Sequence, residues 1–348
     1  MSRDLVLGFD VGATNTRASV GVLSEGGTEP HPAVNGSLTT EASSKGALYD
    51  FVVSVLRLFE DTDRIEAATF AVAGPVEGGV RAKMTNWAES SPIHVDELIA
   101  LGLPRGRTVL VNDLYAGARG LTAWLDRPHR EDDILSIHEG VESERPGNLV
   151  FIAPGTGLGT AGIVRLDDDY LPVAAETQHT LLPAFDDDVR DVIEQFSAAP
   201  SGPPSWEDIA SGVGLSRTYL AYCAILGQPP HLAGGEGASR EIAEAALAGQ
   251  DAAAVRTLEL YYRVLGRYAQ MIALTFQPCD AVYIGGASTR RNLQFIQRST
   301  LVEQFLANRV QGRLLAEIPV RLVLQELNLD GALWEAARVA RAGAPASV

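Results

Sequence analysis

Near the N-terminus the sequence reads Leu5-Val6-Leu7-Gly8-Phe9-Asp10-Val11-Gly12-Ala13-Thr14-Asn15-Thr16-Arg17. An apolar run ends at Asp10, small residues follow, and a second apolar run begins at Ala18. This pattern predicts a β-hairpin with Gly12-Ala13 at its tip. Such a tip can turn backbone N–H groups toward an anion, with Asp10 at a strand end to hold Mg²⁺ and Thr14 to offer a hydroxyl to a phosphate. An ordinary hairpin explains the stretch equally well when it is taken alone.

Composition bounds the possible functions. The chain has 348 residues, 46% hydrophobic and 21% charged, which is typical of a globular protein with two domains or one large one. A net charge of −16 argues against nucleic acid or an anionic membrane as a partner. The two cysteines, Cys223 and Cys279, form no CxxC motif and no ligand cluster. We expect buried thiols in a reducing cytoplasm.

Lysines are scarce. Only Lys45 and Lys83 occur, and neither follows a GxxxxG run. A P-loop and the strand lysine of protein kinases are therefore absent. If the chain handles phosphates, it must use backbone amides, hydroxyls, a metal ion and arginine.

Strands alternate with helices in the first part of the chain. Apolar spacing predicts helices over 45–60 and 95–101, and buried strands over 67–73 and 108–111. The last of these strands leads into Asn112-Asp113, and a helix over 114–125 follows. Asp113 can simply cap that helix, or it can face a ligand at the carboxyl end of a strand.

The opening pattern occurs a second time. A strand over 148–153 is followed by the turn Pro154-Gly155-Thr156-Gly157-Leu158-Gly159 and a strand over 160–166, after a charged, loop-like stretch at 126–147. Two strand–turn–strand units predict two related α/β domains, each with a phosphate turn. Two such turns facing one cleft can grip a nucleotide from both sides.

Further candidates lie in the second half. Glu176 and His179 are three residues apart and can share a face, whereas the acidic run 186–188 is expected to start a helix. Helices are predicted within 238–276, and a strand over 281–284 ends at Gly285-Gly286. That pair can let an adenine lie against the backbone, or it can form a tight turn. The last strand is predicted over 318–324 and the last helix over 331–342.

Together these stretches resemble the bacterial glucokinases, within the superfamily of sugar kinases, actin and chaperone ATPases. The resemblance rests on Asp10–Arg17, Ala73-Gly74-Pro75-Val76, Thr85-Asn86-Trp87, Asn112-Asp113, Gly155–Gly159, Glu207 ahead of Ser211-Gly212, and Gly285-Gly286. The family usually has Glu-Gly-Gly-His where this chain has Glu176-Thr177-Gln178-His179. The related repressor and kinase group carries a cysteine-rich zinc motif, which two isolated cysteines cannot supply, so the resemblance is to the zinc-free type.

The resemblance implies an α/β fold of two actin-like ATPase (ribonuclease H-like) domains around a central cleft. The small domain would be residues 1–111, with the C-terminal helix in 326–348 packing back on it. The large domain would be residues 112–325. Such enzymes commonly pair, which implies a homodimer.

The resemblance also implies roles for single residues. Asp113 would be the catalytic base and would bind the sugar together with Asn86, Asn112, Glu176, His179 and Glu207. ATP would be held by Asp10, Gly12, Ala13, Thr14, Asn15, Gly155, Thr156, Gly157, Gly285 and Gly286, and Asp10 would hold Mg²⁺.

The implied function is ATP-dependent phosphorylation of D-glucose at the 6-hydroxyl, the first step of glycolysis. One alternative is a kinase for another hexose or amino sugar, such as mannose, fructose or N-acetylglucosamine. A second is a sugar-sensing regulator without turnover, disfavoured because Asp113 and both phosphate turns are present and no DNA-binding segment precedes Leu5. A filament-forming or chaperone ATPase would give no reason for the polar sugar-side residues.

Overall fold

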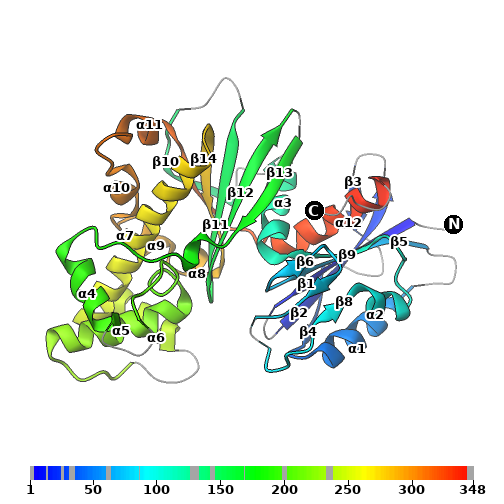
Figure 1. Cartoon of the computed structure of the whole chain (residues 1–348), viewed down its shortest axis with the longest axis horizontal. Coiled ribbons are helices and arrows are strands. Elements are labelled where there is room, and N and C mark those ends of the chain that lie inside the picture. Colours follow the sequence, from blue (N-terminus) through cyan, green and yellow to red (C-terminus); the bar gives the residue numbers. More distant parts are fainter. Residues whose placement is uncertain are drawn as a thin grey trace. The chain divides into compact units, whose positions relative to one another are not determined.

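The computed structural model describes residues 4–12, 15–24, 27–30, 36–59, 64–85, 87–125, 133–141, 146–167, 169–197, 202–232 and 238–342. The chain divides into two compact units (Figure 1). Unit 1 comprises Met1–Arg130 with Glu326–Val348, and unit 2 comprises Glu131–Gln325. Each unit is built on a sheet of six strands.

The main sheet of unit 1 has the order β3-β2-β1-β5-β9, with β4 pairing β2. Its strands are β1 (Asp4–Val11), β2 (Asn15–Ser24), β3 (Gly27–Pro30), β4 (Leu38–Glu41), β5 (Arg64–Val72) and β9 (Thr108–Asn112). A small three-stranded sheet holds β6 (Val76–Glu77), β7 (Arg81–Ala82) and β8 (Ile93–His94). The helices are α1 (Lys45–Leu56), α2 (Val95–Ala100), α3 (Asp113–Leu125) and α12 (Asn328–Ala342).

Alternation along β1 sends its side chains to two different cores. Leu5, Leu7 and Phe9 pack with residues of α1 and α2 on one face of the sheet. Val6 packs with Ala336 and other residues of α12 on the opposite face. The central strand is therefore apolar on both sides, as the continuous run in the sequence predicts.

Small residues let α12 approach α3 and β1 closely (Figure 1). A Cβ placed on Gly331 of α12 would lie 1.7 Å from the carbonyl oxygen of Ala116 in α3, and one on Gly8 of β1 would lie 2.6 Å from the Leu333 nitrogen. The C-terminal helix thus packs on unit 1. Because α3 is part of the same packing, it belongs to unit 1, and the expected boundary after residue 111 moves to Arg130.

The sheet of unit 2 has the order β10-β15-β14-β11-β12-β13. Its strands are β10 (Ile134–His138), β11 (Asn148–Pro154), β12 (Leu158–Leu166), β13 (Asp169–Ala175), β14 (Cys279–Ile284) and β15 (Val320–Val323). The helices are η2 (a 3₁₀ turn, Thr177–His179), α4 (Asp187–Ser197), α5 (Gly212–Leu226), α6 (Ala238–Ala248), α7 (Ala252–Thr275), α8 (Ala287–Arg291), α9 (Leu293–Ile296), α10 (Leu301–Leu306) and α11 (Gly312–Glu317). The long helix α7 is the centre of the core: it packs with α5 and α6 and with buried residues of β11, β14 and β15.

The two sheets repeat one strand order. In unit 1, β1 pairs antiparallel with β2 and parallel with β5, and β5 pairs parallel with β9. In unit 2, β11 pairs antiparallel with β12 and parallel with β14, and β14 pairs parallel with β15. The two strand–turn–strand motifs of the sequence therefore occupy equivalent places in two related sheets, which confirms the predicted α/β class.

Some elements differ from the predictions. The stretch 126–147, predicted as a loop, contains β10, which pairs with β15 at the sheet edge. The strand β13 and the small sheet β6-β7-β8 were also outside the predicted set. No helix in the described part of the chain is both long enough and apolar enough to cross a membrane.

Candidate active site

The carboxyl ends of three parallel strands meet at one edge of the unit 1 sheet. Asp10 on β1 lies beside Ala71 on β5, and Ala71 lies beside Val111 on β9, directly before Asn112. With neighbouring strands about 4.8 Å apart, Asp10 and the Asn112-Asp113 pair end up roughly 10 Å apart along the same edge. The topology therefore brings the predicted metal ligand and the predicted base to one place.

Asp10 is 8% exposed and lies against a cation. Arg17, its partner across the hairpin, donates from Nη2 and Nε to Oδ2 at 2.6 and 3.2 Å and also pairs with Glu326. Burial raises the pKa of the Asp10 carboxyl above its usual range, and the charge and hydrogen bonds of Arg17 offset only part of that effect. The carboxylate is thus held in place from one side by Arg17.

Asn112 and Asp113 join β9 to α3. The Asn112 amide donates to the carbonyl oxygen of Gly74 at 3.2 Å, which ties the strand end to the loop predicted to face the sugar. Oδ1 of Asn112 and Oδ1 of Asp113 both accept from the Leu114 backbone N–H, at 2.9 and 3.0 Å. Asp113 therefore does make the helix-start contact of the simpler interpretation, at the carboxyl end of a strand. The Asp113 side chain is half-buried.

The first phosphate turn is described in part. Ala13 and Thr14, and also Asn86 of the sugar-side loop, lie outside the described residues. Beside them, the Gly12 N–H donates to the carbonyl oxygen of Asn15 at 3.0 Å, which closes the hairpin. Asn15 is exposed at the start of β2.

The second phosphate turn, Gly155–Gly157, is held from two sides. The Gly155 N–H donates to the Gly157 carbonyl at 2.8 Å. The first N–H groups of α5, from Gly212 and Val213, donate to the carbonyls of Gly155 and Thr156 at 2.8 and 3.3 Å. The turn is thus fixed against a helix N-terminus, a region that favours negative charge.

Glu207 links this turn to the predicted sugar side. Its Oε2 accepts from the Leu158 N–H at 2.7 Å, and a Cβ on Gly157 would lie 2.6 Å from the same oxygen. Its Oε1 lies 3.8 Å from Nδ1 of His179. A side chain at position 157 would therefore displace this carboxylate.

Glu176 and His179 lie at the two ends of the 3₁₀ turn η2. Nε2 of His179 lies 3.3 Å from Oε2 of Glu176, and both side chains are more than half exposed, at 57% and 69%. With Glu207 they form one polar group on unit 2. The structure therefore brings together all three of the residues that were predicted for the sugar on this unit.

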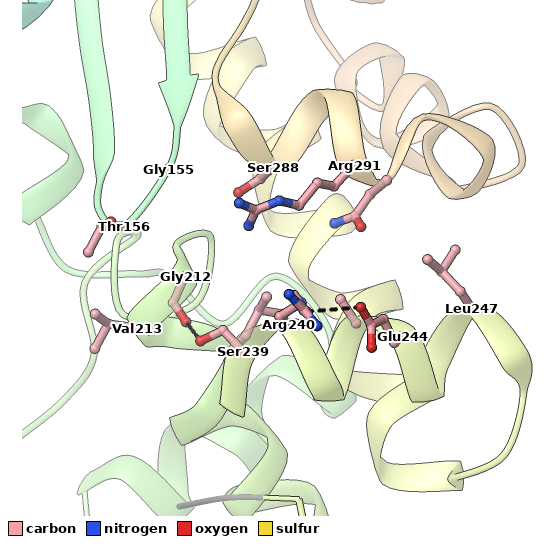
Figure 2. Close-up of a pocket in the computed structure, with 13 residues that line it drawn as sticks. Gly155, Thr156, Gly212, Val213, Ser239, Arg240, Glu244, Leu247, Ser288 and Arg291 are labelled. Carbon is pink, nitrogen blue, oxygen red and sulfur yellow. Dashed lines mark hydrogen bonds and ion pairs between the residues drawn. The ribbon is translucent and has the colours of Figure 1, made fainter. Parts of the chain in front are cut away.

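A cavity of about 560 Å³ lies beside the second phosphate turn (Figure 2). Gly155 and Thr156 lie at one end of it and Leu247 lies at the other. Ser288 and Arg291, from α8, line one side, and Ser239, Arg240 and Glu244, from α6, line the opposite side, with Arg240 paired to Glu244 at 3.1 Å.

Gly285 and Gly286 stand between β14 and α8. Gly286 has φ +86°, and a Cβ there would lie 2.5 Å from the Pro154 carbonyl oxygen. The pair therefore lets the start of α8 approach the end of β11, and the cavity is lined by the residues that follow it rather than by the two glycines.

Sequence reasoning missed the α6 wall. Ser239, Arg240 and Glu244 follow each other along an alanine-rich helix whose existence was predicted. Three polar side chains among alanines on one helix were the available signal, but the face that they occupy depends on tertiary packing.

A magnesium site needs side-chain oxygens that can bind the ion. Among the described residues, no three His, Cys, Asp or Glu side chains lie close enough together to share a metal ion. Asp10 alone is the predicted ligand, which fits Mg²⁺ because this ion is commonly held by one or two carboxylates together with substrate phosphates and water. Arg17 contacts Oδ2 of that carboxylate.

The sequence also matches known proteins over most of its length. The family model described as glucokinase matches residues 7–341. The glucokinase of Rhizobium meliloti is 30% identical over 341 residues, covering 95% of this chain and 91% of its own length.

Solved structures share the fold. The glucokinase of Balamuthia mandrillaris, in complex with glucose, has a TM-score of 0.80 at 21% identity, covering 97% of this chain and 94% of its own. A ROK family glucokinase from Streptomyces griseus, in complex with glucose and AMPPNP, has a TM-score of 0.58 at 21% identity, covering 97% and 100%. Family model, sequence identity and fold agree over nearly the whole chain, and the chain belongs to the glucokinase family.

Proposed function

We propose that this chain transfers the γ-phosphoryl group of ATP to the 6-hydroxyl of D-glucose, giving glucose 6-phosphate. The observation that carries the proposal is the edge of the unit 1 sheet, where Asp10 and Asp113 stand at the ends of β1 and β9. Phosphoryl transfer needs a base for the attacking hydroxyl and charge neutralisation for the phosphates, and this edge offers a carboxylate for each.

Asp113 is the proposed base. Its carboxylate would accept the proton of the sugar 6-hydroxyl as that oxygen attacks the γ-phosphorus and the bond to the β-phosphate oxygen breaks. The neighbouring Asn112 is fixed by the Gly74 carbonyl through one amide hydrogen. A primary amide carries a second hydrogen, which can serve a sugar hydroxyl.

The remaining sugar hydroxyls are assigned to Asn86, Glu176, His179 and Glu207. Carboxylates accept from hydroxyls and a histidine ring can donate or accept, so the group can read several hydroxyls at once. A site built this way rejects analogues that lack a hydroxyl, by roughly 10⁴-fold or more in favourable cases.

The nucleotide is assigned to the cavity of unit 2. Its volume suits a small molecule, and the phosphates would lie at the Gly155–Gly157 end, with the base toward the apolar Leu247 end. Gly12, Ala13, Thr14 and Asn15 are proposed for the phosphates from unit 1. Bound Mg²⁺ at Asp10 would neutralise charge on the β- and γ-phosphates.

Two further properties belong to the proposal. The thiols of Cys223 and Cys279 are free and buried, which supports a cytoplasmic enzyme. A homodimer is proposed from the family resemblance, and light scattering of the purified protein measures it directly.

The test is an assay of sugar-dependent ADP release with D-glucose, mannose, fructose, glucosamine and N-acetylglucosamine. We expect the highest kcat/KM for D-glucose, because two of the four residues of the Glu176–His179 motif and all the other proposed sugar-side residues match the family pattern. A tenfold preference for another of these sugars would replace glucose as the substrate. ATP hydrolysis that no sugar stimulates would overturn the kinase assignment itself.

A further inference from the structure

The two side chains between Glu176 and His179 are both held by hydrogen bonds within unit 2. Thr177 bonds through Oγ1 to the phenol oxygen of Tyr268 at 2.8 Å, and this phenol also bonds Oγ1 of Thr160 at 2.7 Å. Tyr268 lies on α7 and is fully buried. Thr177 therefore turns its hydroxyl into the core and away from the exposed side chains of Glu176 and His179.

Tyr268 connects several segments that carry the polar group. Its ring packs against Trp206 with centroids 5.5 Å apart, and Trp206 directly precedes Glu207. The Trp206 N–H donates to the Thr180 carbonyl at 3.3 Å, which joins the same two segments through the backbone. Thr160 lies on β12, two residues beyond Leu158, whose N–H holds Glu207. The Tyr268 side chain thus contacts β12, the turn that contains Thr177, and the segment that carries Trp206 and Glu207.

Gln178 acts on Glu176 directly. Its side chain is 5% exposed, and its Nε2 donates to Oε2 of Glu176 at 2.7 Å. Its backbone carbonyl accepts from the Glu207 N–H at 3.1 Å. The Glu176 side chain is 69% exposed, and His179 approaches the same oxygen at 3.3 Å, so the Gln178 amide is the shorter of two contacts that limit its rotamers before a ligand binds.

We propose that Gln178, Thr177 and Tyr268 are positioning residues that fix Glu176 for the sugar before it binds. Two residues larger than glycine occupy the middle of the motif, and their side chains take over the ordering of the segment. The inference rests on the proposed function, because it assumes that Glu176 contacts the sugar. On this inference the Thr177-Gln178 pair strengthens binding of the sugar and does not change which sugar is bound.

The first test is Gln178→Met, which keeps the length of the buried side chain and removes the amide donor. A hydrogen bond to a charged group that must be ordered for binding corresponds to about a tenfold rise in the KM for glucose. We expect kcat and the KM for ATP to stay within about twofold. A glucose KM within twofold of wild type would overturn the proposal for Gln178.

A double-mutant cycle separates positioning from general damage. Gln178→Met is combined with Glu176→Ala, which removes the carboxylate that Gln178 holds. If Gln178 acts through Glu176, the change at 178 adds less than twofold to the glucose KM in the Glu176→Ala background. An equal tenfold rise in both backgrounds shows that Gln178 acts independently and contradicts the inference.

The role of Tyr268 is tested with Tyr268→Phe, which keeps the ring against Trp206 and removes the hydroxyl. Tyr219→Phe is the matched control, since Tyr219 is also fully buried in unit 2 and loses a bond to Asp251 at 3.0 Å. We expect a severalfold rise in glucose KM for Tyr268→Phe only. Equal rises in both variants, or none in either, contradict the role of Tyr268.

Thr177 gives a test that does not depend on the buried ring. Thr177→Val removes the hydroxyl and keeps the shape, and Thr177→Ser restores the hydroxyl. The glucose KM should rise severalfold in the first variant and return to within twofold in the second. Failure of the serine variant to restore it would count against the hydrogen bond to Tyr268.

Failure of this inference differs from failure of the proposed function. If Glu176→Ala itself leaves the glucose KM unchanged, Glu176 does not contact the sugar and the proposed sugar site is wrong. If Glu176→Ala raises the KM while the changes at 177, 178 and 268 do not, the sugar site stands and the positioning role alone falls.

Discussion

Asp113 shows how one residue can satisfy a structural and a chemical requirement together. Its Oδ1 accepts from the Leu114 N–H at the start of α3, a contact that any helix-starting aspartate can make. The sequence alone left capping and catalysis open, because both place an aspartate immediately before a helix. The strand register adds the second fact, that Asp113 shares the sheet edge with Asp10.

Asp113→Asn should separate the two roles. Asparagine keeps the size and the helix-start contact but cannot take a proton near neutral pH. We expect kcat to fall by about 10²-fold or more, with the glucose KM changed much less. Steady-state kinetics measures both. Asp96→Asn, an exposed aspartate in the first turn of α2, is the control and should leave kcat within twofold; near-normal turnover in Asp113→Asn removes Asp113 from the mechanism.

Gly157 tests the link between the phosphate turn and Glu207. A methyl group at this position would lie 2.6 Å from Oε2 of Glu207, so the carboxylate must leave the Leu158 N–H. We expect Gly157→Ala to raise the KM for glucose as well as for ATP, each by about tenfold. Gly155→Ala is the matched control, because a Cβ there meets nothing within 4 Å. A glucose KM that moves equally in both variants would show that Glu207 is not responsible.

Single contacts mark the limit of prediction at this scale. The pairing of Asp10 with Arg17 follows from the hairpin register and is local. The Asn112 amide finds its partner at Gly74 and Thr177 finds Tyr268, far away in the sequence. Contacts of this kind depend on tertiary packing, which the spacing of residue types does not record.

At the scale of elements, the acidic run at the start of α4 has a structural role, as predicted. Asp186 caps the helix through the Val189 N–H at 2.8 Å. Asp188 accepts from Tyr222 and Arg263, each at 2.7 Å, and pairs with Arg256. The sequence indicated the dipole contribution, but the arginines come from α7, which only the fold brings to this end of α4.

Asp188→Asn should therefore destabilise the folded state in a pH-dependent way. Burial alone would raise the pKa of Asp188, but hydrogen bonds from Tyr222 and Arg263 and the charge of Arg256 outweigh it and lower the pKa. Because the pKa of Asp188 is lower in the folded state than in the unfolded state, its carboxylate stabilises the fold at pH values above the unfolded pKa of about 3.9. This stabilisation is lost as the pH falls below that value.

Urea unfolding measures this contribution. We expect Asp188→Asn to lose about 2 kcal/mol at pH 7, with a difference from wild type that stays constant down to about pH 5 and shrinks below about pH 4. Asp191→Asn is the control, on the same helix and exposed to solvent. A deficit that grows as the pH falls would have the wrong sign and contradict the assignment.

Whether an element was predicted depended on how strong its pattern was. The long buried strands β1, β5, β11 and β14 and the helix α7 have continuous or periodic apolar residues, and their predictions are confirmed. In β10 every residue is partly exposed, and β13 has the exposed residues Leu171 and Val173. Edge strands of this kind lack the burial that produces a clear pattern.

At the scale of the whole molecule, the repeated strand order explains why two short motifs carried so much information. Each phosphate turn joins two neighbouring antiparallel strands of its sheet, β1 and β2 in unit 1 and β11 and β12 in unit 2, so recognising the turns located both sheets. Unit 1 continues past β9 through α3 to Arg130, because α3 packs on α12, which lies far later in the sequence. That contact depends on glycines whose spacing has no local signature.

Gly331 gives the sharpest test of the chain's return to unit 1. A Cβ on this residue would lie 1.7 Å from the Ala116 carbonyl oxygen, which is backbone and cannot rotate away. Gly331→Ala should therefore force α12 off α3 and destabilise unit 1 by about 3 kcal/mol, the upper range for an overpacked core. Gly46→Ala is the matched control, since Gly46 is also helical but a Cβ there meets nothing within 4 Å. It should be neutral or slightly stabilising.

Hydrogen exchange can localise the effect within the chain. Because α12 covers β1 and β5, their amides should exchange faster in Gly331→Ala, whereas those of β11 and β14 in unit 2 should keep their wild-type protection. Catalysis should fall with the loss of unit 1, because Asp10 lies on β1 and Asp113 directly follows β9. Faster exchange confined to α12, with β1 protected and activity intact, would mean that the helix is an appendage. Unit 1 would then be complete without the chain's return, and the C-terminal segment would have no part in holding the proposed catalytic edge.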